Sequence, residues 1–298
     1  MHTHDRNENY QLTKKNIKIA FILNFIFALA EIAGSLYTNS IAILADALHD
    51  LGDSTTLAFA WWMEKLSGKR EDQQYTYGYR RLSLLSALVS AIILLGGSIF
   101  IVSKSVQRIL NPEPILTRGM LIFSILGMLV NGYAAIRTKR GENLNSQMVF
   151  WHLFEDALGW MAVFVVSIIM IFRPIDVLDP ILSIGISGMM IINVGRQMKK
   201  IFHVFLQGVP PSVNLEAIKK EILKDKKIRD MHHTHIWSLD GSQHVLTTHI
   251  VLHSGSNKDD IRRIKNLIRS LTGKYHLFHS TIEFEYFEED CSMNMSHE

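Results

Sequence analysis

The sequence has a single cysteine, Cys291, in a chain of 298 residues. An intrachain disulfide is therefore excluded, and so is every metal or redox motif that needs two cysteines. The chain also lacks a large excess of charge of either sign, because its formal net charge is only +3. This balance gives no indication of a nucleic-acid partner, and we expect none. The first 18 residues lack an apolar core, so we expect no cleavable signal peptide.

Apolar residues, by contrast, are abundant and clustered, and they make up 48% of the chain. Six apolar segments are each close to the roughly 20 residues that a helix needs to cross a bilayer. They cover residues 17–37, 41–63, 82–102, 120–136, 149–172 and 180–194. One such segment could be a buried core helix, but six in succession predict a polytopic α-helical membrane domain. We expect six transmembrane helices in contact with the lipid bilayer.

Lysine and arginine are unevenly distributed between the loops. They are frequent in the N-terminal arm, in the loops after the second and fourth segments, and after the sixth segment. The opposite loops hold fewer, although Lys104, Arg108 and Arg118 lie between the third and fourth segments. Positively charged loops stay on the cytoplasmic side. We therefore predict a multi-pass protein of the inner (plasma) membrane with both termini in the cytoplasm.

The composition changes after about residue 205, where "LQGVPPS" has the character of a linker. Beyond it, apolar residues at helical spacing alternate with strand-like stretches in the order helix, strand, strand, helix, strand. This order (α-β-β-α-β) predicts a small cytosolic α+β domain of the ferredoxin or metallochaperone-like type. The expected division is an N-terminal arm at 1–15, the membrane domain at 16–204, and the cytosolic domain with a C-terminal tail at 205–298.

Two of the apolar segments carry titratable side chains at matching spacing. In the second segment His49 and Asp53 are four residues apart, so on a helix they share one face. The fifth segment repeats the arrangement with His152 and Asp156. Charged residues at membrane depth are costly and mark an ion or substrate path by default. Two nitrogens and two carboxylate oxygens make a tetrahedral ligand set, which suits Zn²⁺.

Other readings of these polar groups remain open. Each His/Asp pair could be a buried contact that holds two helices together, or part of a proton relay without metal. Among the other polar residues of the first two segments, four are candidates for a supporting role: Asn24, Glu31, Asp46 and Asp50. We expect them to support the ligands, bond across helices or line a wet cavity.

Several longer stretches resemble those of a known family. They are "NFIFALAEIAGSLYTNSIAILADALHDLGD" (24–53), "YTYGYRRL" (75–82), "NPEPI" (111–115), "ENLNSQMVFWHLFEDALG" (142–159), "LDPILS" (178–183) and "HIWSL" (235–239). In these stretches, which follow one another over nearly the whole chain, the sequence resembles the cation diffusion facilitator family, in its zinc-transporting branch. One departure is Ser83, which stands where the family often has an acidic residue.

The resemblance implies a function and a transport site. His49, Asp53, His152 and Asp156 would hold the transported ion, chiefly Zn²⁺ with Cd²⁺ as a common second substrate. Family members are typically homodimers that exchange a divalent cation for protons. We therefore expect proton-coupled efflux of zinc from the cytoplasm by alternating access, at a site between the second and fifth helices.

The resemblance also implies a regulatory zinc ion in the cytosolic domain. His235, His249 and Glu285 match positions that bind metal at the dimer interface in relatives. Three further candidate ligands are His279, Glu283 and Cys291. The alternative is that these side chains form only a solvated, polar face of the sheet.

Two other classes of function compete with transport. The first is a membrane-embedded metalloenzyme, but the chain has no HExxH or HxxEH motif. Hydrolysis also needs an open coordination position, which a four-ligand site does not provide. The second is a metal sensor or scaffold in which the ion is structural. We expect a secondary transporter, a metal ion/proton antiporter, and not an enzyme.

Overall fold

The computed structural model describes residues 21–22, 25–67, 71–139 and 144–286. Asn24, Cys291 and the predicted arm at 1–15 lie outside these residues. The chain divides into two compact units. The first comprises Met1–Trp62 and Ser86–Gln197, and the second comprises Met63–Leu85 and Met198–Glu298. The predicted boundary at residue 205 falls inside the second unit, at the end of a helix.

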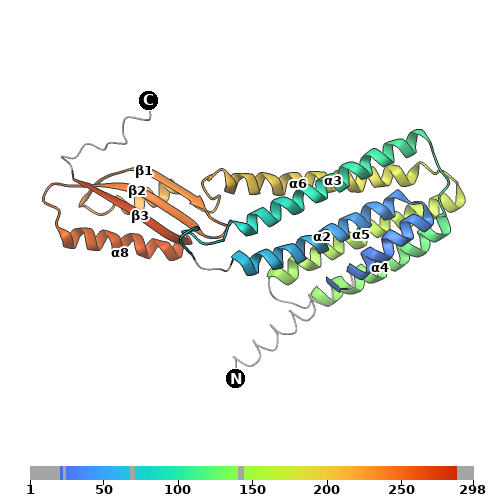
Figure 1. The fold of residues 1–298 in the computed structure, drawn as a ribbon, viewed down its shortest axis with the longest axis horizontal. Helices are drawn as coiled ribbons and strands as arrows, with labels where there is room; N and C mark the ends of the chain where they lie inside the picture. The colour runs from blue at the N-terminus through green and yellow to red at the C-terminus, as the bar shows by residue number, and fades with distance from the viewer. Residues whose placement is uncertain (1–20, 23–24, 68–70, 140–143, 287–298) are drawn as a thin grey trace, which may run out of the picture. The chain divides into compact units, whose positions relative to one another are not determined.

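Long helices make up the first unit (Figure 1). They are α2 (Ile41–Ser67), α3 (Leu82–Leu110), α4 (Thr117–Lys139), α5 (Leu144–Phe172) and α6 (Leu178–Phe205), and a shorter apolar helix, Phe25–Thr38, precedes them. Of the described helices, α3, α4, α5 and α6 are long and apolar enough to cross a membrane. The structure thus shows four candidate spans, and the expected number of six stays a prediction. Helix α2 has the length, with 27 residues, but its carboxylates lower its hydropathy.

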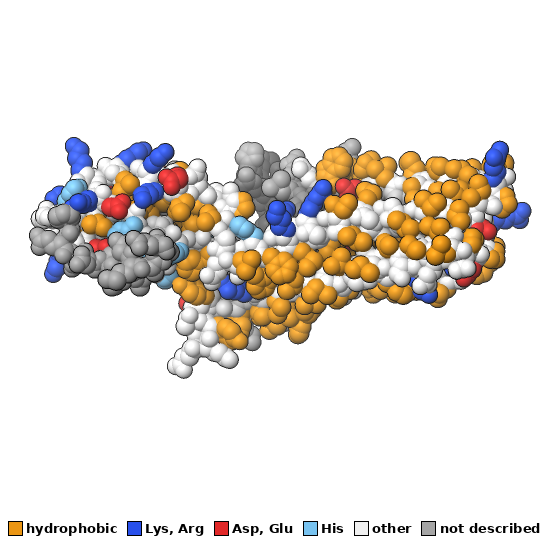
Figure 2. Space-filling view, turned by 90° about the horizontal axis from the view of Figure 1, so that it is seen from above, with side chains coloured by type: hydrophobic (Ala, Val, Ile, Leu, Met, Phe, Trp, Pro, Cys, Tyr) orange, Lys and Arg blue, Asp and Glu red, His pale blue; other side chains and the backbone are white. Residues whose placement is uncertain are grey.

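The side chains of the helices follow the pattern of a lipid-facing bundle. Large apolar residues such as Ile92, Ile122 and Leu129 are exposed, and Figure 2 shows hydrophobic side chains gathered over the helical surface. Small hydroxyl residues are buried, and Ser167 donates to the carbonyl oxygen of Val163 at 2.7 Å. A continuous apolar surface of this extent needs an apolar surrounding. The first unit is therefore a helical membrane domain.

The second unit contains a three-stranded sheet with two helices. Its elements are α7 (Leu215–Ile222), β1 (Ile228–Ser238), β2 (His244–Leu252), α8 (Lys258–Lys274) and β3 (Leu277–Tyr286). The sheet order is β1-β2-β3, with β1 and β2 antiparallel and β2 and β3 parallel. The short connection between β1 and β2 is a turn with Gly241 at φ +94, a conformation that favours glycine. The parallel pair needs a crossover, which α8 provides.

One apolar core holds this sheet and its helices together. Ile218 from α7, Ile264 from α8 and Ile250 from β2 are fully buried members of it. Helix α8 begins with a capping box in which the Asn257 side chain accepts from the backbone N–H of Asp260 and the Asp260 carboxylate accepts from that of Asn257. These local signals and the shared core fix the sheet, whose remaining face carries the histidines.

Candidate metal sites

The four predicted transport ligands converge between α2 and α5. Nε2 of His152 lies 3.0 Å from Oδ2 of Asp53, and Nε2 of His49 lies 3.7 Å from Oδ1 of Asp156. Within each helix the corresponding distances are 3.8 Å for His49–Asp53 and 3.6 Å for His152–Asp156. The two imidazole rings are 5.6 Å apart at an angle of 73°. Each side chain is therefore paired within its own helix and across to the other one, as a shared four-donor site requires.

Burial differs among these donors. The Asp156 side chain is 5% exposed, whereas that of His152 is 36% exposed. Nδ1 of His49 is buried and has no hydrogen-bond partner among the described residues. The imidazole of His49 therefore makes its described polar contacts through Nε2, which faces the carboxylates of Asp53 and Asp156.

The start of α2 is held by a side chain from another helix. Asp179, at the beginning of α6, accepts from the hydroxyl of Ser40 at 2.5 Å and from the backbone N–H of Ile41 at 2.7 Å. A third, longer bond comes from the backbone N–H of Ala42 at 3.3 Å. A carboxylate at a helix N-terminus satisfies unpaired N–H groups and complements the helix dipole. Asp179 thus anchors α2 about two turns before His49.

The position of α5 depends on close packing against α4. The fully buried Trp160 ring lies edge-on to Phe27, with 5.7 Å between the ring centroids. It also lies so close to Gly127 that a Cβ there would overlap the indole. Only glycine permits this approach. Trp160 follows Asp156 by one helical turn, so this contact also positions Asp156, one of the four predicted ligands.

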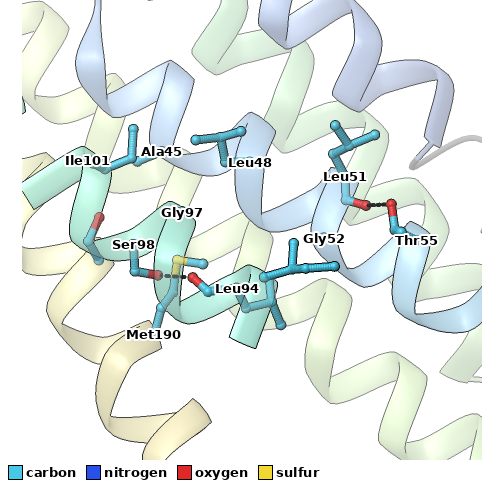
Figure 3. A pocket seen from close by; sticks show the side chains of 12 residues that line it. Ala45, Leu48, Leu51, Gly52, Thr55, Leu94, Gly97, Ser98, Ile101 and Met190 are labelled. Atoms are coloured by element: carbon cyan, nitrogen blue, oxygen red, sulfur yellow. Dashed lines mark hydrogen bonds between the residues drawn. The ribbon is translucent and has the colours of Figure 1, made fainter. Parts of the chain in front are cut away.

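On another side, α2 borders a partly open pocket. A cavity of about 140 Å³ lies between α2, α3 and α6, and Figure 3 shows the side chains that line it. Small residues from each helix contribute to its wall, including Gly52, Gly97 and Ser187. Because neither ligand of α2 lines it, the cavity is separate from the His/Asp site.

Three of the residues expected to support the ligands form a cluster of their own. Glu31, Asp46 and Asp50 are buried and each offers one oxygen within 4.8 Å of the others. Asn24, the fourth, lies outside the described residues. The sequence placed these acids near the ligands but did not predict that they meet each other, because Glu31 comes from a different helix.

A second group of possible metal ligands lies on the sheet of the second unit. Nδ1 of His249 is 2.6 Å from Oε1 of Glu285, and Nε2 of His232 is 3.3 Å from Oε2 of the same carboxylate. These three residues each offer one donor atom within 4.8 Å of the others. Glu283 lies at the rim, with an oxygen 3.4 Å from Nε2 of His249. Two imidazole nitrogens and a carboxylate oxygen are donors that Zn²⁺ accepts, so the residues fit the regulatory ion that the resemblance implies.

The other predicted cytosolic ligands are placed differently. His235 is exposed and does not belong to the three-residue group, in which His232 is found instead. The reason is an irregularity in β1 between His232 and His235, with His233 at φ 50, which breaks the alternation of side chains. The ring of His279 lies edge-on to Tyr77, 5.7 Å away. Cys291 is outside the described residues.

Comparison with known proteins identifies the family. Residues 17–206 match the cation efflux transmembrane domain, and residues 210–287 match the cytoplasmic domain of cation efflux proteins. The chain belongs to the cation efflux family, as its resemblance in sequence predicted. Its relatives are named as metal transporters and antiporters, so the prediction of a membrane transporter and not an enzyme is confirmed.

Individual relatives cover almost the whole chain. The zinc transporter ZitB of Yersinia pseudotuberculosis is 31% identical over 290 residues, which are 95% of this chain and 92% of that protein. The metal cation efflux system protein CzcD of Cupriavidus metallidurans is 29% identical over 286 residues, 95% of this chain and 89% of that one. The cadmium, cobalt and zinc/H(+)-K(+) antiporter of Bacillus subtilis is 29% identical, covering 94% and 91%.

Among solved structures, the metal-bound C-terminal domain of the Cupriavidus CzcD transporter is similar. It is 32% identical and covers 24% of this chain and 99% of that chain, with a TM-score of 0.22.

Proposed function

We propose that the protein exports Zn²⁺ from the cytoplasm in exchange for protons, with Cd²⁺ as a second substrate. The transport ligands are His49, Asp53, His152 and Asp156, between α2 and α5. The observation that carries the proposal is the convergence of two imidazoles and two carboxylates from two helices, with nitrogen–oxygen distances of 3.0 to 3.8 Å across the site. The names of the relatives, which include zinc transporters and a cadmium, cobalt and zinc antiporter, support the choice of ion.

The ligand chemistry supports proton exchange. Zn²⁺ binds neutral imidazole and ionised carboxylate, so its binding releases any protons that these groups hold. Histidine changes charge near neutral pH, which lets protons and the ion compete for His49 and His152. Where protons are more abundant, outside the cell, they displace the ion. The proton gradient then drives export.

Alternating access requires the site to open to each side in turn. On α2, most side chains between its start and the ligands are buried, as Ile43 and Asp46 show, whereas Leu44, Leu48 and the ligand His49 are partly exposed. We infer that the site is open toward the later end of α2, which the loop charges place in the cytoplasm. The cavity between α2, α3 and α6 offers space for α2 to shift.

The second unit supports a homodimer with a regulatory ion. Its match to the cytoplasmic domain of cation efflux proteins, whose name denotes a dimer, favours a second copy as partner. We assign the regulatory Zn²⁺ to His232, His249 and Glu285, with His232 in the place first expected for His235. An ion there would neutralise the carboxylate and fix the three strands against one another.

Transport in proteoliposomes tests the main proposal. With an imposed pH gradient, the wild type should accumulate Zn²⁺ and move protons in the opposite direction, whereas Asp53→Ala and Asp156→Ala should do neither. Glu155→Ala is the matched control, because Glu155 is a neighbouring but exposed carboxylate of α5. Normal uptake by both ligand variants, or Zn²⁺ uptake without proton movement, contradicts the proposal. Zn²⁺ binding without any uptake would favour a sensor.

A further inference from the structure

The cluster of Glu31, Asp46 and Asp50 is separate from the four transport ligands. Its members are 0%, 6% and 0% exposed, and their oxygens approach within 4.8 Å. Asp46 and Asp50 come from α2 and Glu31 from the helix Phe25–Thr38. We call this group the acidic triad.

The carboxylates of the acidic triad lack partners in the described part of the chain. Both oxygens of Glu31, both of Asp50 and Oδ2 of Asp46 accept no hydrogen bond from a described residue. No described lysine, arginine or histidine pairs with any of the three within 4.0 Å, although His49 follows Asp46 by less than one turn. Three ionised carboxylates at this separation repel one another and have lost their hydration, so either protons or a bound cation must neutralise them, since no described side chain pairs with them.

A donor from α5 faces the same place. Trp160 is fully buried, and its indole N–H lies beside the carboxylate of Asp46 without completing a hydrogen bond. Indole nitrogen only donates, so it can orient a carboxylate but not compete with a cation for it. The indole N–H is thus a second buried polar group directed into the cluster, of the kind that supports a ligand from behind.

We propose that the acidic triad is a second cation site, built only from oxygen ligands, which holds a divalent ion. Carboxylate oxygens suit hard cations such as Mn²⁺ and Ca²⁺, whereas Zn²⁺ prefers sites with nitrogen or sulfur. Zinc therefore binds the triad more weakly than it binds the His/Asp site.

The position of the triad gives the second site a role. Asp46 lies about one turn nearer than His49, and about two turns nearer than Asp53, to the start of α2, which the loop charges place outside the cytoplasm, while Asp50 lies next to His49 in the chain. An ion that leaves the His/Asp site in that direction meets the triad next. Because the triad binds Zn²⁺ more weakly, the ion can then leave the triad toward the outside. This role rests on the proposed export, whereas the binding of a cation does not.

Manganese binding to the full chain tests the second site directly. In detergent or nanodiscs, Asp53→Ala and His249→Ala together disable the transport and cytosolic sites, and this double variant serves as background. Electron paramagnetic resonance counts bound Mn²⁺, and we expect one ion per chain. Adding Glu31→Gln should weaken this binding by at least about tenfold, because the affinity of such sites depends on the number of charged ligands.

Matched variants make the result decisive. Adding Glu155→Gln to the background makes the same chemical change at an exposed carboxylate and should leave Mn²⁺ bound. Asp46→Asn is a second triad variant, used if Glu31→Gln does not elute as a folded protein. The proposal is overturned if the background binds no Mn²⁺, as protonated carboxylates would predict, or if the triad variants bind it unchanged. Because no step requires transport, failure of the antiport assay leaves this result interpretable.

Discussion

Replacing Asp179 should uncouple the start of α2 from α6. Asp179→Ala removes the acceptor for the Ser40 hydroxyl and for the N–H groups of Ile41 and Ala42, all of which are buried. Loss of a helix cap costs about 0.5–2 kcal/mol. A buried N–H left without an acceptor adds about 1–3 kcal/mol. We expect the free energy of unfolding to fall by about 1.5–5 kcal/mol in total.

The measurement is equilibrium unfolding of the full chain in mixed micelles with increasing SDS, together with zinc uptake. Asp179→Asn keeps one acceptor and should lie between wild type and Asp179→Ala. Ser183→Ala is the control, because the Ser183 hydroxyl only donates to a backbone oxygen of its own helix, at 2.8 Å. Equal loss of stability in Asp179→Ala and Ser183→Ala would refute the idea that the Asp179 carboxylate anchors α2.

Two further predictions concern other parts of the molecule. Gly127→Val should lower the free energy of unfolding by about 1–3 kcal/mol and reduce zinc uptake, because the valine side chain overlaps Trp160 and so displaces Asp156. Gly132→Val is the control, since its added Cβ meets nothing within 4 Å, and it should have a smaller effect in both assays. Burial lowers the pKa of His244 below its usual value. His244 then takes up a proton more readily in the unfolded chain than in the folded one. In urea unfolding of residues 206–298, the free energy of unfolding should therefore fall as the pH decreases through about 6.5. His244→Gln should show less of this decrease, and an unchanged pH profile would contradict the reasoning.

The pairing within each His/Asp pair was predictable from the sequence because the rule that places the side chains is local. Residues four apart share a face of any α-helix, so His49 and Asp53 had to point together, as did His152 and Asp156. The approach of the two pairs to each other depends on how the helices pack, which no local rule gives. It was inferred only because each pair offers half of a metal site. The structure brings these four side chains together.

The cytosolic group was harder because its geometry depends on an irregular strand. The expectation that His235 joins His249 and Glu285 assumes a regular β1, whereas the strand is irregular between His232 and His235 and brings His232 to these two residues instead. The doublet of histidines at 232 and 233 gives no indication of which one joins His249 and Glu285, and both rings lie near that of His249. The anchor at Asp179 was missed for a related reason, since a capping residue is normally sought next to its own helix and this one lies 138 residues beyond Ile41.

Helix α2 shows how function limits the membrane fold. It carries three carboxylates and a histidine on one side, so that side cannot face lipid. The apolar residues Ala42, Ile43 and Ala47 in its first turns are also buried. The other helices of the bundle must therefore enclose α2. Asp179 holds the start of α2, where buried N–H groups without acceptors would be costly. Each cation that binds to α2 also neutralises charge that opposes this enclosure. We conclude that occupancy of the His/Asp site and of the acidic triad should stabilise the packing of α2, which couples the bound ion to the arrangement of the helices around it.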